Sequence, residues 1–90
     1  GVYNESSSPS MDNVTATASG GTNNYGVVND SSSSTIRNSS ITGSTNSIYN
    51  DSSSGAKVAD TALGGVVTGT GFTCLGVYTT AFVALNGGCL

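Results

Sequence analysis

The residues best suited to chemistry in this chain are three carboxylates in three similar polar segments. NESSS begins at residue 4 and NDSSS begins at residues 29 and 50, so Glu5, Asp30 and Asp51 occupy equivalent places. If the segments stack with these side chains outward, the like charges repel, and a bound cation such as Ca²⁺ would relieve that repulsion. Three solvated turn carboxylates are the simpler alternative, so a calcium site here is a hypothesis.

The same acids give little support for catalysis. A glycoside hydrolase needs two carboxylates across a cleft, whereas the acids here fall in turns at equivalent places of a repeat. Arg37 is the only arginine, and it aligns with Asp12 one repeat earlier, so a weak ion pair accounts for it. We therefore expect no enzymatic activity and assign no catalytic residue.

Two tyrosines could form a carbohydrate-binding face. Tyr3 and Tyr49 occupy equivalent places, with Val28 at the same place between them. Aromatic rings aligned on one face can stack against sugars, because a ring offers an apolar surface beside a polar handle. Half-buried packing at the corners of the fold is the simpler explanation.

A second candidate binding face consists of aligned hydroxyl groups. Thr15 and Thr17 flank Ala16, and 25 residues later Ser40 and Thr42 flank Ile41 in the same way. A flat array of this kind is typical of ice-binding β-solenoids. The third repeat reads Ala62-Leu63-Gly64, and outward Ser and Thr are ordinary on β-sheets, so the pattern predicts ice binding weakly.

The only two cysteines, Cys74 and Cys89, lie near the C-terminal end of the sequence. A cysteine pair in a polar, lysine-poor chain fits an oxidising compartment, so we predict a disulfide between them. It would close a loop of about 15 residues, worth roughly 3 kcal/mol on the chain-entropy model. Two buried free thiols are the alternative, and two thiolates without histidine make only half of a zinc site.

Composition excludes several classes of function. Ser, Thr, Asn and Gly make up more than half of the 90 residues, 8% are charged, and the net charge is −3. Arg37 and Lys57 are the only cations, so we expect no binding to nucleic acid, whose phosphates require several. No run of about 18 apolar residues is present, so we expect no membrane span.

These residues belong to an internal repeat. Asn4, Asn29 and Asn50 start the three polar segments at offsets of 25 and 21, and an apolar pair precedes each. Between them, β-branched and apolar residues alternate in short runs separated by Ser, Asn and Gly, as in strands joined by turns. Because no unit can bury a face alone, the repeat predicts an all-β right-handed parallel β-helix, a solenoid of about three coils.

The period sets the expected boundaries. Residues 1–65 form the coils, at about 1–25, 26–47 and 48–65. The second unit is shorter by about four residues, lost near 18–21. Residues 66–90 are more apolar and break the period, so we expect them to cap the stack. No such cap precedes the first coil, which we expect to be covered by upstream coils or by another copy.

The polar segments then have a structural explanation. In a stack, equivalent residues lie about 4.8 Å apart, so identical inward asparagines can hydrogen bond to one another along it. Asn4, Asn29 and Asn50 are the candidate ladder. Asn13 and Asn38, with Asp60, form a second and weaker candidate. The serines that follow the first ladder would satisfy the backbone of the turns.

Two long segments resemble a known family. The segment MDNVTATASGGTNNYGVVNDSSSSTIRNSSITGSTNSIYNDSS (11–53) resembles repeats of bacterial secreted right-handed parallel β-helix proteins of the pectin-lyase-like superfamily. KVADTALGGVVTGTGFTCLGVY (57–78), followed by Cys89, resembles their C-terminal closing segment. The resemblance implies a secreted bacterial protein, extracellular or at the cell surface, of which this chain is a C-terminal portion.

The expected function is therefore a non-enzymatic extracellular structural or adhesive module, and end-to-end assembly into a fibre is a further expectation. A polysaccharide- or ice-binding solenoid is the alternative. A polysaccharide lyase, suggested by the resemblance alone, is the third interpretation. We expect no cofactor, with Ca²⁺ as the one candidate ion. The expected partners are further coils, another copy of the chain, or carbohydrate.

Overall fold

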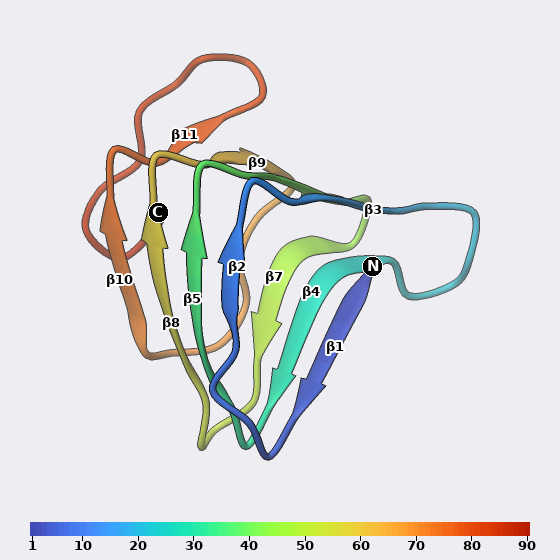
Figure 1. Cartoon of the computed structure of the whole chain (residues 1–90). Helices are drawn as coiled ribbons and strands as arrows, with labels where there is room; N and C mark the ends of the chain where they lie inside the picture. The colour runs from blue at the N-terminus through green and yellow to red at the C-terminus, as the bar shows by residue number, and fades with distance from the viewer.

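The computed structural model describes all 90 residues. It contains eleven β-strands and no helix. No helix long and apolar enough to cross a membrane is present. Neighbouring strands run parallel in three sheets: sheet A (β1-β4-β7), sheet B (β10-β8-β5-β2) and sheet C (β11-β9-β6-β3) (Figure 1). The strands are β1 (Val2–Glu5), β2 (Ser10–Asp12), β3 (Thr15–Ala18), β4 (Tyr25–Asp30), β5 (Ser33–Arg37), β6 (Ser40–Gly43), β7 (Asn46–Asn50), β8 (Gly55–Ala59), β9 (Ala62–Gly64), β10 (Phe72–Leu75) and β11 (Tyr78–Thr79).

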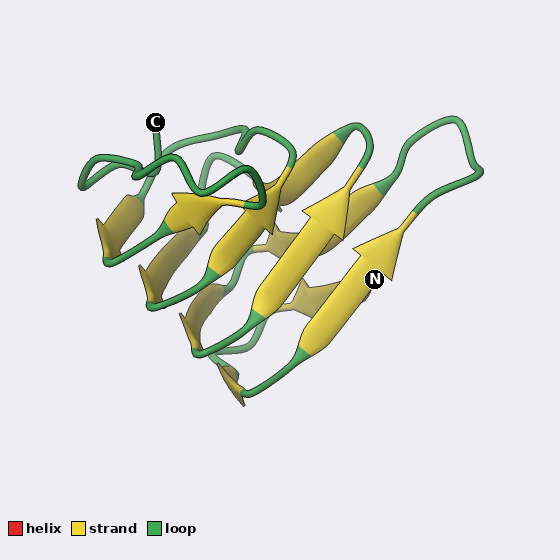
Figure 2. Ribbon diagram, turned by 90° about the horizontal axis from the view of Figure 1, so that it is seen from above, coloured by secondary structure: helices red, strands yellow, loops and turns green.

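Successive strands of the chain belong to sheets A, B and C in turn. We call each set of three successive strands a rung, so that β1–β3, β4–β6 and β7–β9 lie one after another along the stack, as Figure 2 shows. The all-β expectation is confirmed, and the parallel sheets are compatible with the predicted β-helix.

The pairing register follows the sequence repeat. Val2 pairs with Val27, and Val27 pairs with Ile48, at the offsets of 25 and 21. The change of offset falls between Ala18, which still pairs at 25, and Tyr25, which pairs at 21. The extra residues of the first rung form the loop that projects from the stack between β3 and β4 (Figure 1).

The interior consists of aligned apolar columns, because alternate residues of each strand point inward. The second rung contributes Val27, Ile36 and Ile41, all fully buried, and the third contributes Ile48, Val58 and Leu63. Each rung therefore covers the apolar side chains of the one before it, as expected for a stack whose units cannot bury a face alone.

The C-terminal segment first extends the sheets and then reverses. β10 pairs parallel with β8, and β11 with β9, so sheets B and C extend beyond residue 66. The chain then turns back, with an antiparallel bridge between Tyr78 and Ala84, and the amide of Cys74 donates to Gly87 O at 2.8 Å. A disulfide joins Cys74 to Cys89 and fastens this returning segment to β10.

One interior residue departs from the hydrogen-bonding pattern. Ser34 on β5 is buried, and its Oγ is the only buried side-chain polar atom without a hydrogen-bond partner. Its register partner on β8 is Ala56. We predict that Ser34→Ala raises the free energy of unfolding by about 1 kcal/mol, because it removes an unsatisfied hydroxyl and leaves a side chain that the column already accommodates.

Chemical denaturation measures this effect, and Ser32→Ala is the matched control. Ser32 is equally buried, but its Oγ accepts from Ser7 N and lies 2.9 Å from Asp30 O. The control should lose about 1–2 kcal/mol. Equal losses in the two variants would show that the Ser34 hydroxyl is satisfied.

Candidate functional site

A ladder of buried asparagine side chains runs through sheet A. Asn4 pairs in register with Asn29, and Asn29 with Asn50. Asn4 Nδ2 donates to Asn29 Oδ1 at 2.9 Å, and Asn29 Nδ2 donates to Asn50 Oδ1 at 2.8 Å. Every amide thus points the same way, with its donor toward the later rung.

The two ends of the ladder differ. At the C-terminal end, Asn50 Nδ2 donates to Thr70 O at 2.9 Å, and the ladder stops because the next place belongs to Gly69. A Cβ at Gly69 would lie within van der Waals overlap of Asn50 O, so no side chain fits there. At the N-terminal end, the chain supplies no donor to Asn4 Oδ1.

At the turns between the sheets, serine and threonine hydroxyl groups also accept hydrogen bonds from the preceding rung. Ser32 Oγ accepts from the backbone amide of Ser7 at 3.1 Å, and Ser54 Oγ accepts from the amide of Ser32 at 3.0 Å. At the next corner, Ser39 and Thr61 occupy the corresponding places, with 3.3 Å from Ser39 N to Thr61 Oγ1. These hydroxyls satisfy turn backbone that has no strand partner.

The second expected ladder does not form by side-chain pairing. Asn13 and Asn38 are exposed, and with Asp60 they have φ values of 59°, 49° and 47°, in the left-handed region. Asn38 Nδ2 donates to Asp12 Oδ1 at 3.3 Å instead of to Asn13. Asparagine and aspartate tolerate this backbone conformation better than most residues, which explains their recurrence here.

Asp51 is held by several donors in the turn after β7. Its Oδ1 accepts from Ser54 Oγ at 2.6 Å and from Ser53 N at 3.1 Å, and its Oδ2 accepts from Ser31 N at 3.1 Å. The hydrogen bond from Ser54 is the main cause that lowers the pKa of Asp51 from 3.8 to about 2. The acid after this asparagine therefore organises the turn.

The other two acids continue the column without forming a metal site. Glu5 pairs in register with Asp30, and Asp30 Oδ2 accepts from the Tyr3 hydroxyl at 2.8 Å. That hydrogen bond raises the pKa of Tyr3. No group of three or more His, Cys, Asp or Glu side chains is arranged to hold a metal ion, so Glu5, Asp30 and Asp51 are not gathered as a calcium site requires.

The tyrosines are arranged differently from the expected sugar-stacking pair. Tyr3 is 61% exposed and leans toward Asp30 through its hydroxyl. Tyr49 stacks with Tyr25, at 5.2 Å between ring centroids, and both rings are half-buried. Val28 lies between Tyr3 and Tyr49 in register, so the two predicted residues share a column without touching as a pair.

The predicted hydroxyl face is present but short. Thr15 pairs with Ser40 and Thr17 with Thr42 on sheet C. In the next rung the partners are Ala62 and Gly64, which end both columns. The face therefore spans two rungs.

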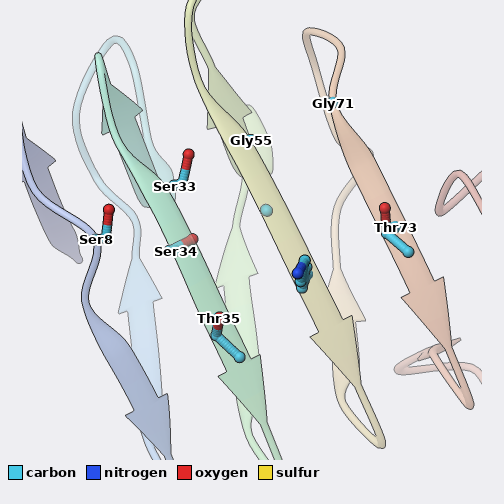
Figure 3. A pocket seen from close by; sticks show the side chains of 9 residues that line it. Ser8, Ser33, Ser34, Thr35, Gly55, Gly71 and Thr73 are labelled. Carbon is cyan, nitrogen blue, oxygen red and sulfur yellow. The ribbon is translucent and has the colours of Figure 1, made fainter.

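Sequence reasoning missed a groove on the outer side of sheet B. It has a volume of about 230 Å³. Its hydroxyls come from Ser33, Thr35 and Thr73 on the strands and from Ser8 in the segment before β2, as Figure 3 shows, and Lys57, Gly55 and Gly71 complete the lining. An adjoining hollow of about 140 Å³ adds Arg37, so both cations of the chain lie along this side. The signal was available in the register, which aligns Gly55 with Ser33 and Lys57 with Thr35.

The N-terminal edge consists of strands that each lack a partner on one side. β1, β2 and β3 each stand at the end of their sheet, so all three first-rung strands expose one row of backbone amides and carbonyls. Such an edge is a template for pairing with another strand. Together with the open Asn4 Oδ1, it is the best-defined candidate interaction site.

Comparisons with known proteins do not assign the chain: no family model matches it, and neither a curated protein nor a solved structure does.

The lowered pKa of Asp51 predicts a pH-dependent stability. The ionised carboxylate stabilises the folded chain above about pH 4, and this contribution is lost as the pH falls through about 2. We predict that Asp51→Asn lowers the melting temperature at pH 6, and that the difference from the wild type shrinks between pH 4 and pH 2.

Thermal melts of both proteins across this range check the prediction. Ser54→Ala, which removes the main donor to Asp51, should move the transition toward ordinary carboxylate pH values. A melting-temperature difference that stays constant from pH 6 to pH 2 would contradict the assignment.

Proposed function

We propose that this chain is a non-enzymatic structural module, a segment of a right-handed parallel β-helix of the pectin-lyase-like type in a secreted bacterial protein. Its role is to continue and terminate a longer stack of coils outside the cell. The observation that carries this proposal is the contrast between an open N-terminal edge and a closed C-terminal one.

The open edge specifies its partner chemically. The ladder lacks a donor at Asn4 Oδ1, and an inward amide in a preceding rung would supply it. The Ser7 backbone amide already donates to Ser32 Oγ, so the corner pattern also runs from earlier to later rungs. A preceding coil with an asparagine at the ladder position and parallel strands satisfies both patterns.

The closed end favours upstream coils over a fibre of identical copies. Residues 83–90 return antiparallel along the last strands, and the disulfide holds them there. The ladder's last donor, Asn50 Nδ2, is used on Thr70 O. The C-terminal end of another copy therefore offers no free ladder donor to Asn4, and its returning segment already hydrogen bonds to Cys74, Val77 and Thr79 along part of the strand edges.

The disulfide also supports the extracellular location, because such bonds persist in oxidising compartments. The polar, weakly charged composition suits a solvent-exposed stalk or surface module.

Polysaccharide binding is the second candidate function, and the groove on sheet B is the observation that favours it. Hydroxyls of Ser33, Thr35 and Thr73 and the ammonium of Lys57 could hydrogen bond to sugar hydroxyls. Loss of glycan-array binding in Lys57→Ala would distinguish this function from a purely structural one.

An added coil tests the structural proposal. In this variant a copy of residues 25–46 is placed directly ahead of Gly1. The register is kept, because Gly1 then follows the copied residue 46 just as Ser47 follows residue 46 in the chain itself. We predict that this insertion raises the melting temperature by about 5 °C or more and protects the backbone amides of β1 from hydrogen exchange.

The control insertion is identical except for alanine in place of the asparagine that copies Asn29. It provides the strands without the ladder donor, so it should stabilise the chain less. An insertion that leaves β1 amides unprotected would show that the edge does not accept a further coil.

A further inference from the structure

The returning segment ends in a turn built around one asparagine side chain. Asn86 Oδ1 accepts from the Gly88 amide at 2.9 Å and from the Leu90 amide at 3.0 Å, and Asn86 N donates to Leu90 O at 3.1 Å. The Asn86 side chain is nevertheless exposed, and the residue after it is Gly87. Asn86 is therefore both fixed in orientation and open to solvent.

Asn86 differs from the other exposed asparagines in the backbone amide that follows it. At the other three, this amide donates to a hydroxyl group of the next rung: after Asn13 it is Val14 N to Ser39 Oγ at 3.1 Å, after Asn23 it is Asn24 N to Thr45 Oγ1 at 2.9 Å, and after Asn38 it is Ser39 N to Thr61 Oγ1 at 3.3 Å. The Gly87 amide has no acceptor within the chain. Its nitrogen is therefore the only one of the four that can react without breaking a hydrogen bond.

An asparagine side chain can react with the backbone amide that follows it. The Gly87 nitrogen, after losing its proton to hydroxide, forms a bond to Asn86 Cγ. Asn86 Nδ2 then leaves as ammonia with a proton from water, and a cyclic imide remains. Water opens the imide on either side, so residue 86 becomes an aspartate in the normal linkage or an isoaspartate whose main chain runs through Cγ. The net reaction consumes water and releases ammonia, with no oxidation or reduction.

The turn around Asn86 favours this reaction. The hydrogen bond from Gly88 closes a ring of atoms that contains both Asn86 Cγ and Gly87 N, so the reacting atoms are held near each other. The Gly88 and Leu90 amides both donate to Oδ1, where negative charge develops as the new bond forms, and fixed donors of this kind stabilise such a charge. Gly87 also carries no Cβ beside the attacking nitrogen.

We propose that Asn86–Gly87 is a self-modification site of the folded chain, at which Asn86 deamidates to aspartate and isoaspartate without an enzyme. The modification does not depend on the structural role proposed above. It affects the C-terminal closure, because Gly87 O accepts from Cys74 N at 2.8 Å and Cys74 is disulfide-bonded to Cys89. Isoaspartate lengthens the main chain before Gly87 and displaces Gly87 O from the Cys74 amide. Normal aspartate keeps the main chain, and its carboxylate accepts from the same two amides.

Incubation of the purified, disulfide-bonded chain in mildly alkaline buffer tests the proposal. Peptide mapping by mass spectrometry should locate aspartate and isoaspartate at residue 86, while Asn13, Asn23 and Asn38 stay intact. The matched variant is Gly87→Ala, which keeps the fold because the added Cβ meets only Cys74 O at 4.0 Å. Its conversion should be roughly tenfold slower, which corresponds to about 1.4 kcal/mol in the barrier, because the methyl group crowds the attacking nitrogen.

Thermal melts test the effect on the closure. The isoaspartyl form, separated by chromatography, should melt about 4 °C or more below the unmodified chain, whereas Asn86→Asp should melt close to it. Conversion of Asn86 only after denaturation, or equal rates in the wild type and Gly87→Ala, would overturn the proposed site. An isoaspartyl form that melts with the unmodified chain would overturn its effect on the closure.

Discussion

The inward-facing asparagines of sheet A are hydrogen bonded mainly to the asparagine at the same place in the neighbouring rung. This pairing fixes the register of the stack, since a slip of one residue would turn the Asn29 amide outward and the apolar column with it. The two hydrogen bonds that join Asn4, Asn29 and Asn50 lie in the interior, where an unpaired amide is costly. The apolar columns supply the driving force for stacking, and the ladder specifies which residues meet.

At the turns between the sheets, serine hydroxyl groups likewise bond to the neighbouring rung. Ser32 and Ser39 each satisfy a backbone amide of the preceding rung, so the polar segments contribute to the stack as the strands do. The stack therefore has a direction. The side-chain amides of Asn4 and Asn29 and the turn amides of Ser7 and Val14 all donate from an earlier rung to a later one. The first rung is consequently left with an open acceptor, whereas the last ends on Thr70 O and a returning, disulfide-bonded segment.

Much of this arrangement could be predicted from the sequence, because equal offsets in apolar and polar residues report register directly. The Asn4–Asn29–Asn50 alignment and the loop near residues 18–21 follow from those offsets alone. Repetition could not reveal which way a side chain points. Asn13 and Asn38 repeat as regularly as the ladder, but their left-handed backbone turns them outward. The groove beside Lys57 was also missed, because it depends on glycines in neighbouring strands and not on a motif.

The central claim is that the asparagine side chains are hydrogen bonded to one another inside the stack. Hydrogen exchange of the side-chain amides, followed by NMR on the ¹⁵N-labelled chain, measures this most directly. The account predicts that the Nδ2 protons of Asn4 and Asn29 exchange far more slowly than those of Asn23, which is exposed in the loop between β3 and β4. Equal and rapid exchange at all three residues would contradict it.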